Sequence, residues 1–154
     1  MGCRTDQLRL SLDKMLQGLA SQTGAFFQLQ NASRPSCSLY GYPGFQALNV
    51  SGSVEAIGVA RGGSYQINDP GPHIVPLSPG QSAYFGVGWG DYDAVKDTTK
   101  GCINAAHVVS VPPNTYSALS TDATLTSICP EGGGTPKVTI TAVAPKSAFT
   151  IASP

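Results

Sequence analysis

Acid–base chemistry in this chain would depend on its two histidines, His73 and His107, because histidine is the side chain that titrates near neutral pH. The chain also has three aspartates in one short stretch, Asp91, Asp93 and Asp97, and calcium prefers carboxylates on a turning loop. Counted as an EF-hand from Asp91, however, the fifth, sixth and twelfth positions hold unsuitable residues, Val95, Lys96 and Cys102. We therefore expect a solvated acidic loop and two histidines with structural roles.

Nucleophilic catalysis has no support in the sequence. There is no G-x-S-x-G elbow, and a cysteine–histidine protease would need a free cysteine, whereas we expect all four cysteines to be paired. The glycine run at residues 132–134 lacks the lysine of a phosphate-binding loop. The sequence thus predicts no catalytic residue, no metal site and no cofactor. The alternative hypothesis is an envelope enzyme or metal-handling protein that uses His73 or His107 with the loop at residues 91–97, which requires these groups to converge in space.

Four tyrosines are the candidate ligand-binding residues: Tyr40, Tyr42, Tyr65 and Tyr92. Aromatic faces that are exposed together contact sugar rings and apolar ligands. Tyr40 and Tyr42 lie in a predicted loop at residues 37–44 and are the better-exposed candidates. Trp89, by contrast, continues the apolar face of a predicted strand and is expected in the core. A carbohydrate site would require the tyrosines to lie on one contiguous surface.

The four cysteines allow three disulfide pairings, and strand symmetry favours one of them. None has the C-x-x-C spacing of zinc or redox motifs. Strands are expected on either side of residue 20, which places Cys3 opposite Cys37. A second hairpin is expected about residues 115 and 116, which places Cys102 opposite Cys129. The alternative is four buried free thiols.

Two disulfides predict an oxidising compartment, because such bonds do not persist in a reducing cytosol. We expect an exported protein whose leader has been removed before Cys3. A bacterial lipoprotein carries its lipid on a cysteine at the mature N-terminus, and Cys3 is close enough to that position to be a candidate. Lipidation of Cys3 would exclude its pairing with Cys37, so the two interpretations are mutually exclusive.

Composition limits the class of protein. The chain has 154 residues, enough for one domain, and we expect a single domain at residues 3–145 followed by a C-terminal tail at 146–154. Nine basic residues balance nine acidic ones, so no positive field would attract nucleic acid. The sequence contains no run of about 20 apolar residues, the length that a transmembrane helix needs. The 18 glycines, 12 prolines and 12% charged residues are unlike a helical bundle.

Alternating apolar residues predict the elements that position these side chains. The clearest case is Ala83, Phe85, Val87 and Trp89, which share one face of a strand. Similar strands are expected at residues 25–29 and 138–142, a hairpin at 45–50 and 54–60 about Gly52, and a turn at 77–80. Leucines of the first 20 residues fit either a strand or a helix, and the expected disulfide favours a strand at 7–13 with a loop or short helix at 14–20. Residues 62–71 and 90–101 are the long loops, where a sandwich or barrel usually carries its function.

Residues 31–44 carry a more specific pattern. They read Asn-Ala-Ser, a match to the glycosylation sequon, and end in Cys-Ser-Leu-Tyr-Gly-Tyr-Pro-Gly. This block resembles the N-x-S…C-x-L-x-G-Y-P-G signature of an actinobacterial family, the domain of unknown function 4232. The early cysteine before a leucine-rich strand, the Leu-Ser-Pro-Gly turn at 77–80 and the two late cysteines are also similar to that family.

The resemblance implies a secreted or lipid-anchored domain of the actinobacterial envelope with an immunoglobulin-like fold, and it brings no catalytic residues. The expected fold is therefore an all-β, immunoglobulin-like antiparallel sandwich of about seven to nine strands, braced by two disulfides. Gly41, Pro43 and Gly44 are expected to shape a turn, and Tyr42 either packs there or belongs to a binding surface. The expected function is a non-enzymatic binding or scaffold module for an unknown envelope protein or glycan.

Overall fold

The computed structural model describes residues 1–152. In that range the backbone forms ten strands and two short 3-10 helices: η1 (Thr5–Gln7), β1 (Leu8–Met15), β2 (Gln22–Asn31), β3 (Cys37–Leu39), β4 (Gln46–Leu48), β5 (Gly58–Arg61), β6 (Val75–Leu77), β7 (Ser82–Gly90), β8 (Ile103–Ser110), β9 (Leu119–Ile128), β10 (Lys137–Ile140) and η2 (Lys146–Ala148).

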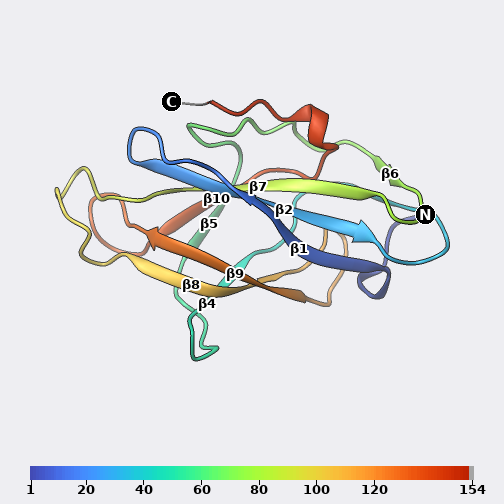
Figure 1. Cartoon of the computed structure of the whole chain (residues 1–154), viewed down its shortest axis with the longest axis horizontal. Coiled ribbons are helices and arrows are strands. Elements are labelled where there is room, and N and C mark those ends of the chain that lie inside the picture. The colour runs from blue at the N-terminus through green and yellow to red at the C-terminus, as the bar shows by residue number, and fades with distance from the viewer. Residues whose placement is uncertain (153–154) are drawn as a thin grey trace.

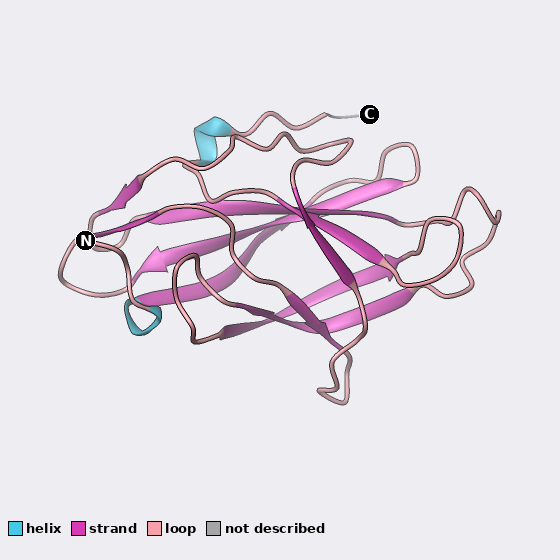
Figure 2. Cartoon of the chain, turned by 180° about the vertical axis from the view of Figure 1, so that it is seen from behind, coloured by secondary structure: helices cyan, strands magenta, loops and turns pink. Residues whose placement is uncertain are grey.

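Two facing sheets make up the sandwich (Figure 1). One sheet has five strands in the order β1-β2-β7-β10-β5, and the other has three in the order β4-β8-β9. The short strands β3 and β6 pair separately beside the N-terminus. At one side β1 packs against β9 and joins the two sheets. Seen from behind, the same two layers are connected by long loops at both ends (Figure 2). The all-β sandwich is confirmed.

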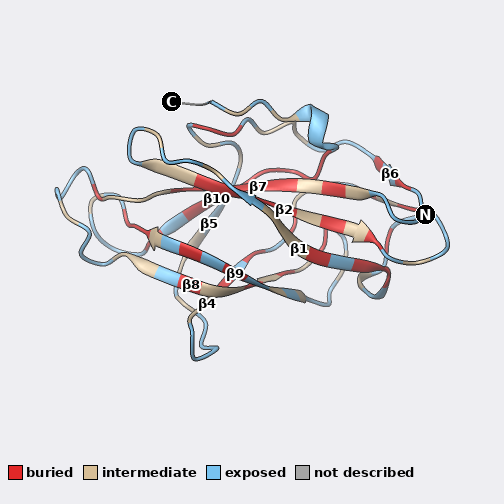
Figure 3. Ribbon diagram, in the orientation of Figure 1, coloured by how far each residue is buried: buried red, intermediate tan, exposed pale blue. Residues whose placement is uncertain are grey.

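The core lies between the two sheets, where the alternating side chains predicted from sequence meet. Phe27 of β2 lies opposite Phe85 of β7, and their rings stack with centroids 5.6 Å apart. Phe45, which precedes β4 in the other sheet, contacts Phe27 edge-on at 5.9 Å. Trp89 is 2% exposed, so its predicted burial is confirmed. Buried residues recur along the strands that face this space (Figure 3), which is the pattern that period-two alternation produces.

The outer face of the five-stranded sheet is covered by residues 62–71. Gly24 and Gly86 leave space there for Ile67, which is 1% exposed. A Cβ placed on Gly86 would lie 2.8 Å from Ile67 Cγ2, and one on Gly88 would lie 2.5 Å from the side chain of Ser64. These glycines are therefore needed for close approach rather than for turning. One of the two long loops is thus a structural cover of the sheet.

The described part of the expected C-terminal tail, residues 146–152, packs on the same outer face. The Phe149 ring contacts Phe26 edge-on at 5.0 Å. Lys146 Nζ lies 2.9 Å from an Asp13 carboxylate oxygen and 5.2 Å from the centre of the Tyr84 ring. Residues 153 and 154 of the tail lie outside the described residues. The tail therefore contributes contacts to the sandwich.

The first 20 residues form the predicted strand and not the alternative helix. β1 begins at Leu8 and ends at Met15, slightly later than the expected 7–13, and Leu8 and Leu10 are buried. It pairs with β2 in antiparallel register, with Leu10 opposite Leu29. Residues 14 and 15 belong to β1, so only the remainder of the expected loop at 14–20 connects the two strands.

Two expectations about strand pairing need correction. The turn about Gly52 forms as predicted, and Leu48 bridges Val54, but the strand expected at 54–60 does not continue as a hairpin. The chain crosses to the other sheet, where β5 pairs in parallel with β10 and Val59 lies opposite Val138. The five-stranded sheet is therefore mixed rather than wholly antiparallel. The two facing sheets hold five and three strands, which agrees with the expected seven to nine, and β3 and β6 form a separate pair. Alternation places a side chain on a face but does not choose the partner strand.

Both predicted disulfides are confirmed. The Cys3–Cys37 bond joins Cα atoms 4.8 Å apart, and the Cys102–Cys129 bond joins Cα atoms 4.1 Å apart. No cysteine is free, which excludes the alternative of four buried thiols. Because its thiol is bonded to Cys37, Cys3 is not available to carry a lipid.

The N-x-S part of the signature is a turn in which only the Asn31 side chain is buried. Asn31 is 0% exposed, and its Nδ2 donates to the carbonyl oxygens of Pro35 at 2.9 Å and Leu77 at 3.1 Å. Its Oδ1 accepts hydrogen bonds from the Ser33 backbone N–H at 3.0 Å and from the Ser33 hydroxyl at 2.6 Å. The Asn31 side chain thus forms four hydrogen bonds that hold the turn together, which is a structural role. The same burial and bonding make the Asn31 amide inaccessible for glycosylation in the folded protein.

The Gly-Tyr-Pro-Gly part of the signature joins distant strands. Gly41 has a φ of 108°, and its carbonyl oxygen accepts from the Val143 N–H at 2.9 Å. The Gly44 N–H donates to the Val111 carbonyl at 2.8 Å. The interpretation of the signature as a fold motif is consistent with these contacts, which bring Tyr40 and Tyr42 to a fixed place at one end of the sandwich.

Candidate functional site

The two histidines do not meet the acidic loop. His107 Nδ1 on β8 lies 2.8 Å from Asp122 Oδ1 on the neighbouring strand β9, and the Asp122 side chain is 93% exposed. His73 is exposed, and its Nδ1 lies 2.9 Å from the Gly71 carbonyl oxygen of its own turn. No group of three or more histidine, cysteine or acidic side chains within residues 1–152 is arranged to hold a metal ion. The convergence that the alternative hypothesis requires does not occur.

Asp93 gives the acidic loop a structural role. Its side chain is 0% exposed, and its two oxygens accept four backbone hydrogen bonds of 2.8–3.1 Å. The donors are the N–H groups of Val95, Lys96, Gly132 and Gly133. Although burial opposes it, this set of donors lowers the pKa of Asp93. The carboxylate therefore joins the loop at residues 90–101 to the glycine run at 132–134.

Asp97 is also engaged, because it accepts a hydrogen bond from the Tyr92 hydroxyl. This bond raises the pKa of Tyr92. Tyr92 lines a cleft of about 310 Å³ between the loops at 20–22, 90–94 and 129–131. In both cartoons these loops lie at the end of the sandwich opposite the N-terminus (Figures 1 and 2).

The four candidate tyrosines are therefore divided between different parts of the surface. Tyr40 and Tyr42 lie together at the N-terminal end, whereas Tyr92 lies at the opposite end. Tyr65 is 63% exposed on the loop at residues 62–71. It lines neither the cleft that contains Tyr92 nor the one that contains Tyr40. None of the four is fully buried. A shared aromatic surface is formed by Tyr40 with a residue that sequence analysis did not select, Tyr116.

Tyr40 and Tyr116 line a cleft with a volume of about 700 Å³. Their exposed fractions are 51% and 103%, so both rings are accessible to a ligand. The remaining lining residues are mostly small and polar: Gly2, Cys3, Arg4, Thr5, Asp6, Ser38, Pro113, Asn114, Thr115, Ser117 and Leu119. The cleft thus lies between the N-terminal segment, the end of β3 and the loop that leads into β9.

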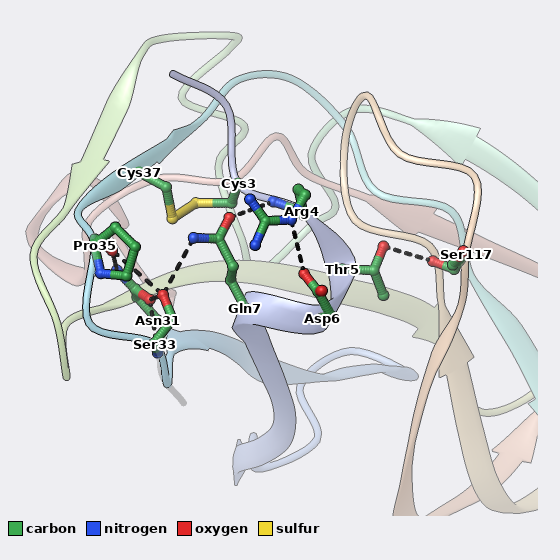
Figure 4. Close-up of polar contacts among 10 residues, drawn as sticks. All are labelled: Cys3, Arg4, Thr5, Asp6, Gln7, Asn31, Ser33, Pro35, Cys37 and Ser117. Atoms are coloured by element: carbon green, nitrogen blue, oxygen red, sulfur yellow. Dashed lines mark hydrogen bonds and ion pairs between the residues drawn. A yellow bond between two sulfur atoms is a disulfide. The ribbon is translucent and has the colours of Figure 1, made fainter.

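The N-terminal wall is held by covalent and hydrogen bonds (Figure 4). The Cys3–Cys37 disulfide joins it to β3, and the Cys3 N–H donates to the Ser38 carbonyl at 2.8 Å. The Thr5 hydroxyl donates to the Ser117 carbonyl at 3.1 Å and so connects the two walls. The wall is therefore pre-organised before a ligand arrives.

The opposite wall is a tight loop at residues 111–118. Asn114 adopts a positive φ of 60°, a conformation that asparagine tolerates, and its Nδ2 donates to the Tyr40 carbonyl at 2.9 Å. The Thr115 hydroxyl donates to the Pro112 carbonyl at 2.8 Å. These contacts present the Tyr116 side chain to solvent. The Pro-Pro-Asn sequence at 112–114 was an available signal for this turn, but nothing local indicates that it lies beside Tyr40.

A smaller depression of about 260 Å³ adjoins the cleft. Tyr40, Pro113 and Asn114 line both spaces, while Tyr42 and Arg61 line only the smaller one. The two spaces therefore share a border formed by Tyr40 and the loop at residues 111–118.

Tyr42 is half-buried in this depression, and its hydroxyl donates to Asp69 Oδ2 at 2.6 Å. The bond raises the pKa of Tyr42. Although burial opposes it, the bonds from Tyr42 and from the backbone N–H groups of Ala142 and Gly71 lower the pKa of Asp69. Tyr42 thus packs in its turn, as one of the two sequence-based interpretations predicts, and its partly exposed side chain also lines the depression.

The chemistry available in the larger cleft is that of recognition. The hydroxyls of Thr5 and Thr115 donate within the protein, but their oxygens can still accept hydrogen bonds. Two phenol rings provide apolar faces. The two charged lining residues, Arg4 and Asp6, pair with each other at 3.1 Å. The cleft therefore suits a ligand that is hydroxylated, has an apolar face and carries little charge where it meets these groups.

Fold and cleft define a small disulfide-braced β-sandwich domain with a structured depression at one end. The chain belongs to the family described as Domain of unknown function (DUF4232), whose model matches residues 3–144. The family resemblance recognised in the signature is thereby confirmed. No curated protein and no solved structure is significantly similar to the chain.

Within residues 1–152, no helix has the length and apolar character needed to cross a membrane. Two disulfides in a domain of this size are consistent with an extracytoplasmic location, because oxidising compartments preserve such bonds.

Proposed function

We propose that the protein is a non-enzymatic binding module of the actinobacterial cell envelope, and that it binds a glycan in the cleft between Tyr40 and Tyr116. The observation that carries this proposal is the pairing of two exposed phenol rings with a wall of hydroxyl and amide groups. A pyranose ring has an apolar C–H face bordered by hydroxyl groups, and this surface matches both features. The pre-organised walls favour ligand binding over a purely scaffolding role.

Envelope association is supported by the two disulfides and by the resemblance of the signature to an actinobacterial family. A lipid anchor on the precursor would have to be carried by a residue other than Cys3, since Cys3 is bonded to Cys37. The absence of an enzymatic role is a proposal in its own right. It predicts that an oligosaccharide incubated with the protein is recovered unchanged.

The proposal is tested by isothermal titration of the oxidised protein with chitotetraose, cellotetraose and maltotetraose. We expect one of these to bind at a single site, and Tyr40→Ala and Tyr116→Ala each to weaken binding by about fivefold or more, as removal of a stacked ring does. Tyr65→Ala is the matched control, because the Tyr65 ring is also exposed but lies outside the cleft. If neither these three sugars nor an acidic tetrasaccharide binds, or if the Tyr65 variant loses as much affinity, the result would contradict a glycan site in this cleft.

A further inference from the structure

The smaller depression contains a second cation, Arg61, whereas the cation of the larger cleft, Arg4, is paired with Asp6. Arg61, the last residue of β5, is exposed and has its guanidinium carbon 5.1 Å from the centre of the Tyr42 ring. The depression is lined by this side chain together with Tyr40, Gly41, Tyr42, Pro72, Pro113 and Asn114. The planar guanidinium thus lies beside an aromatic face, an arrangement that limits its orientation.

Arg61 has no acidic partner among the residues that the structure describes. The ion pairs formed within residues 1–152 join Arg4 to Asp6, His107 to Asp122 and Lys146 to Asp13. Arg61 therefore retains donors that a ligand can use.

The acidic side chain bound to Tyr42 is Asp69, which is already engaged. Its Oδ2 accepts the Tyr42 hydroxyl hydrogen bond, and its Oδ1 accepts from the N–H groups of Gly71 and Ala142, each at 3.0 Å. Asp69 thus holds Tyr42 in place below the guanidinium.

We propose that Arg61 binds the carboxylate of an acidic sugar, so that the ligand is a glycan in which an acidic residue adjoins the ring contacted by Tyr40. This inference rests on the proposed function, and it specifies the ligand class of that same site. Tyr40, Pro113 and Asn114 line both spaces, so a single oligosaccharide extends from the larger cleft into the depression. A guanidinium fork matches a carboxylate through two parallel hydrogen bonds.

A carboxylate fits the depression better than a phosphate monoester. Arg61 is the single cation among its described lining residues, and one guanidinium balances a monoanion. A dianionic phosphate would have only half of its charge balanced there.

The test uses a matched pair of ligands, a hyaluronan tetrasaccharide and the same tetrasaccharide with its carboxyl groups reduced to alcohols. At low ionic strength we expect the acidic form to bind about fivefold more tightly, the upper range for an exposed ion pair, and the preference to shrink as salt is added. Arg61→Gln should abolish the preference, so that the two forms bind the variant with equal affinity. Arg34→Gln is the control, because Arg34 is exposed and lies outside both spaces.

The outcomes separate this inference from the proposed function. Equal affinity of the wild-type protein for the two forms would overturn the role of Arg61 and leave the glycan cleft intact. A preference that persists in the Arg61→Gln variant would overturn it as well. Failure of both forms and of all neutral tetrasaccharides to bind would overturn the proposed function, and this inference with it.

Discussion

Removal of the Cys3–Cys37 disulfide is the most informative perturbation of this protein, because that bond both stabilises the sandwich and holds one wall of the cleft. The cysteines are 34 residues apart. In the chain-entropy account, a bond closing a loop of that length stabilises the folded state by about 4 kcal/mol. The Cys102–Cys129 bond closes 27 residues, and because the dependence on loop length is logarithmic, its contribution is also about 4 kcal/mol.

The double variants Cys3→Ser/Cys37→Ser and Cys102→Ser/Cys129→Ser should therefore lose nearly equal stability. For a domain of this size, a loss of about 4 kcal/mol lowers the melting temperature by roughly 8–16 °C. Guanidinium denaturation monitored by Trp89 fluorescence measures the loss directly. A loss below about 1 kcal/mol in either variant would refute the loop-closure argument.

The two variants should differ in where the protein loosens. Without the Cys3–Cys37 bond, hydrogen bonds still hold the wall at residues 1–6. They include the backbone bond from residue 3 to Ser38 and the bond from the Thr5 hydroxyl to Ser117. We expect faster amide hydrogen exchange there and weaker glycan binding. Loss of the other bond should leave both unchanged, because Cys102 and Cys129 do not line the cleft. Equal exchange at residues 1–6 in the two variants would contradict the assignment of that wall to the first disulfide.

Three further predictions concern the fold. Gly86→Ala should destabilise the protein by roughly 1–3 kcal/mol in thermal unfolding, because the added methyl overlaps Ile67; a combined Ile67→Ala change should not add its full single-variant loss. Phe149→Ala should cost about 1 kcal/mol through loss of the edge-on contact with Phe26, and a variant as stable as wild type in denaturant would show that the tail does not support the sheet. Asp93 has a lowered pKa in the folded state, so its contribution is present above the unfolded pKa of about 3.9 and lost as pH falls through the lower folded value; Asp93→Asn should flatten this acid limb of a pH-dependent melting series, and an unchanged limb would contradict it.

Much of the sandwich follows from local pattern. Ala83, Phe85, Val87 and Trp89 face the core because side chains of a strand alternate between its two faces. The disulfides follow from the same regularity, since residues equidistant from the middle of a hairpin lie opposite each other.

The arrangement between segments depended on contacts that no local pattern contains. Alternation at 54–60 was compatible with a hairpin, but β5 pairs with β10, some 80 residues further along the chain. By alternation, Gly86 is an ordinary outward position of a strand, but Ile67 from a distant loop packs against it. The role of Asp93 also required two loops to meet.

The sequence by itself determined the fold class, the inward faces of the strands, both disulfides and the family. Each depends on spacing along one or two neighbouring strands, which backbone geometry converts directly into position. Tertiary structure alone decided the candidate site. Tyr40 lines one space with Tyr116 and the adjoining space with Arg61, because three separate segments come together at the same end of the sandwich. The long-range packing that brings loops together leaves no periodic pattern in the sequence of the loops themselves.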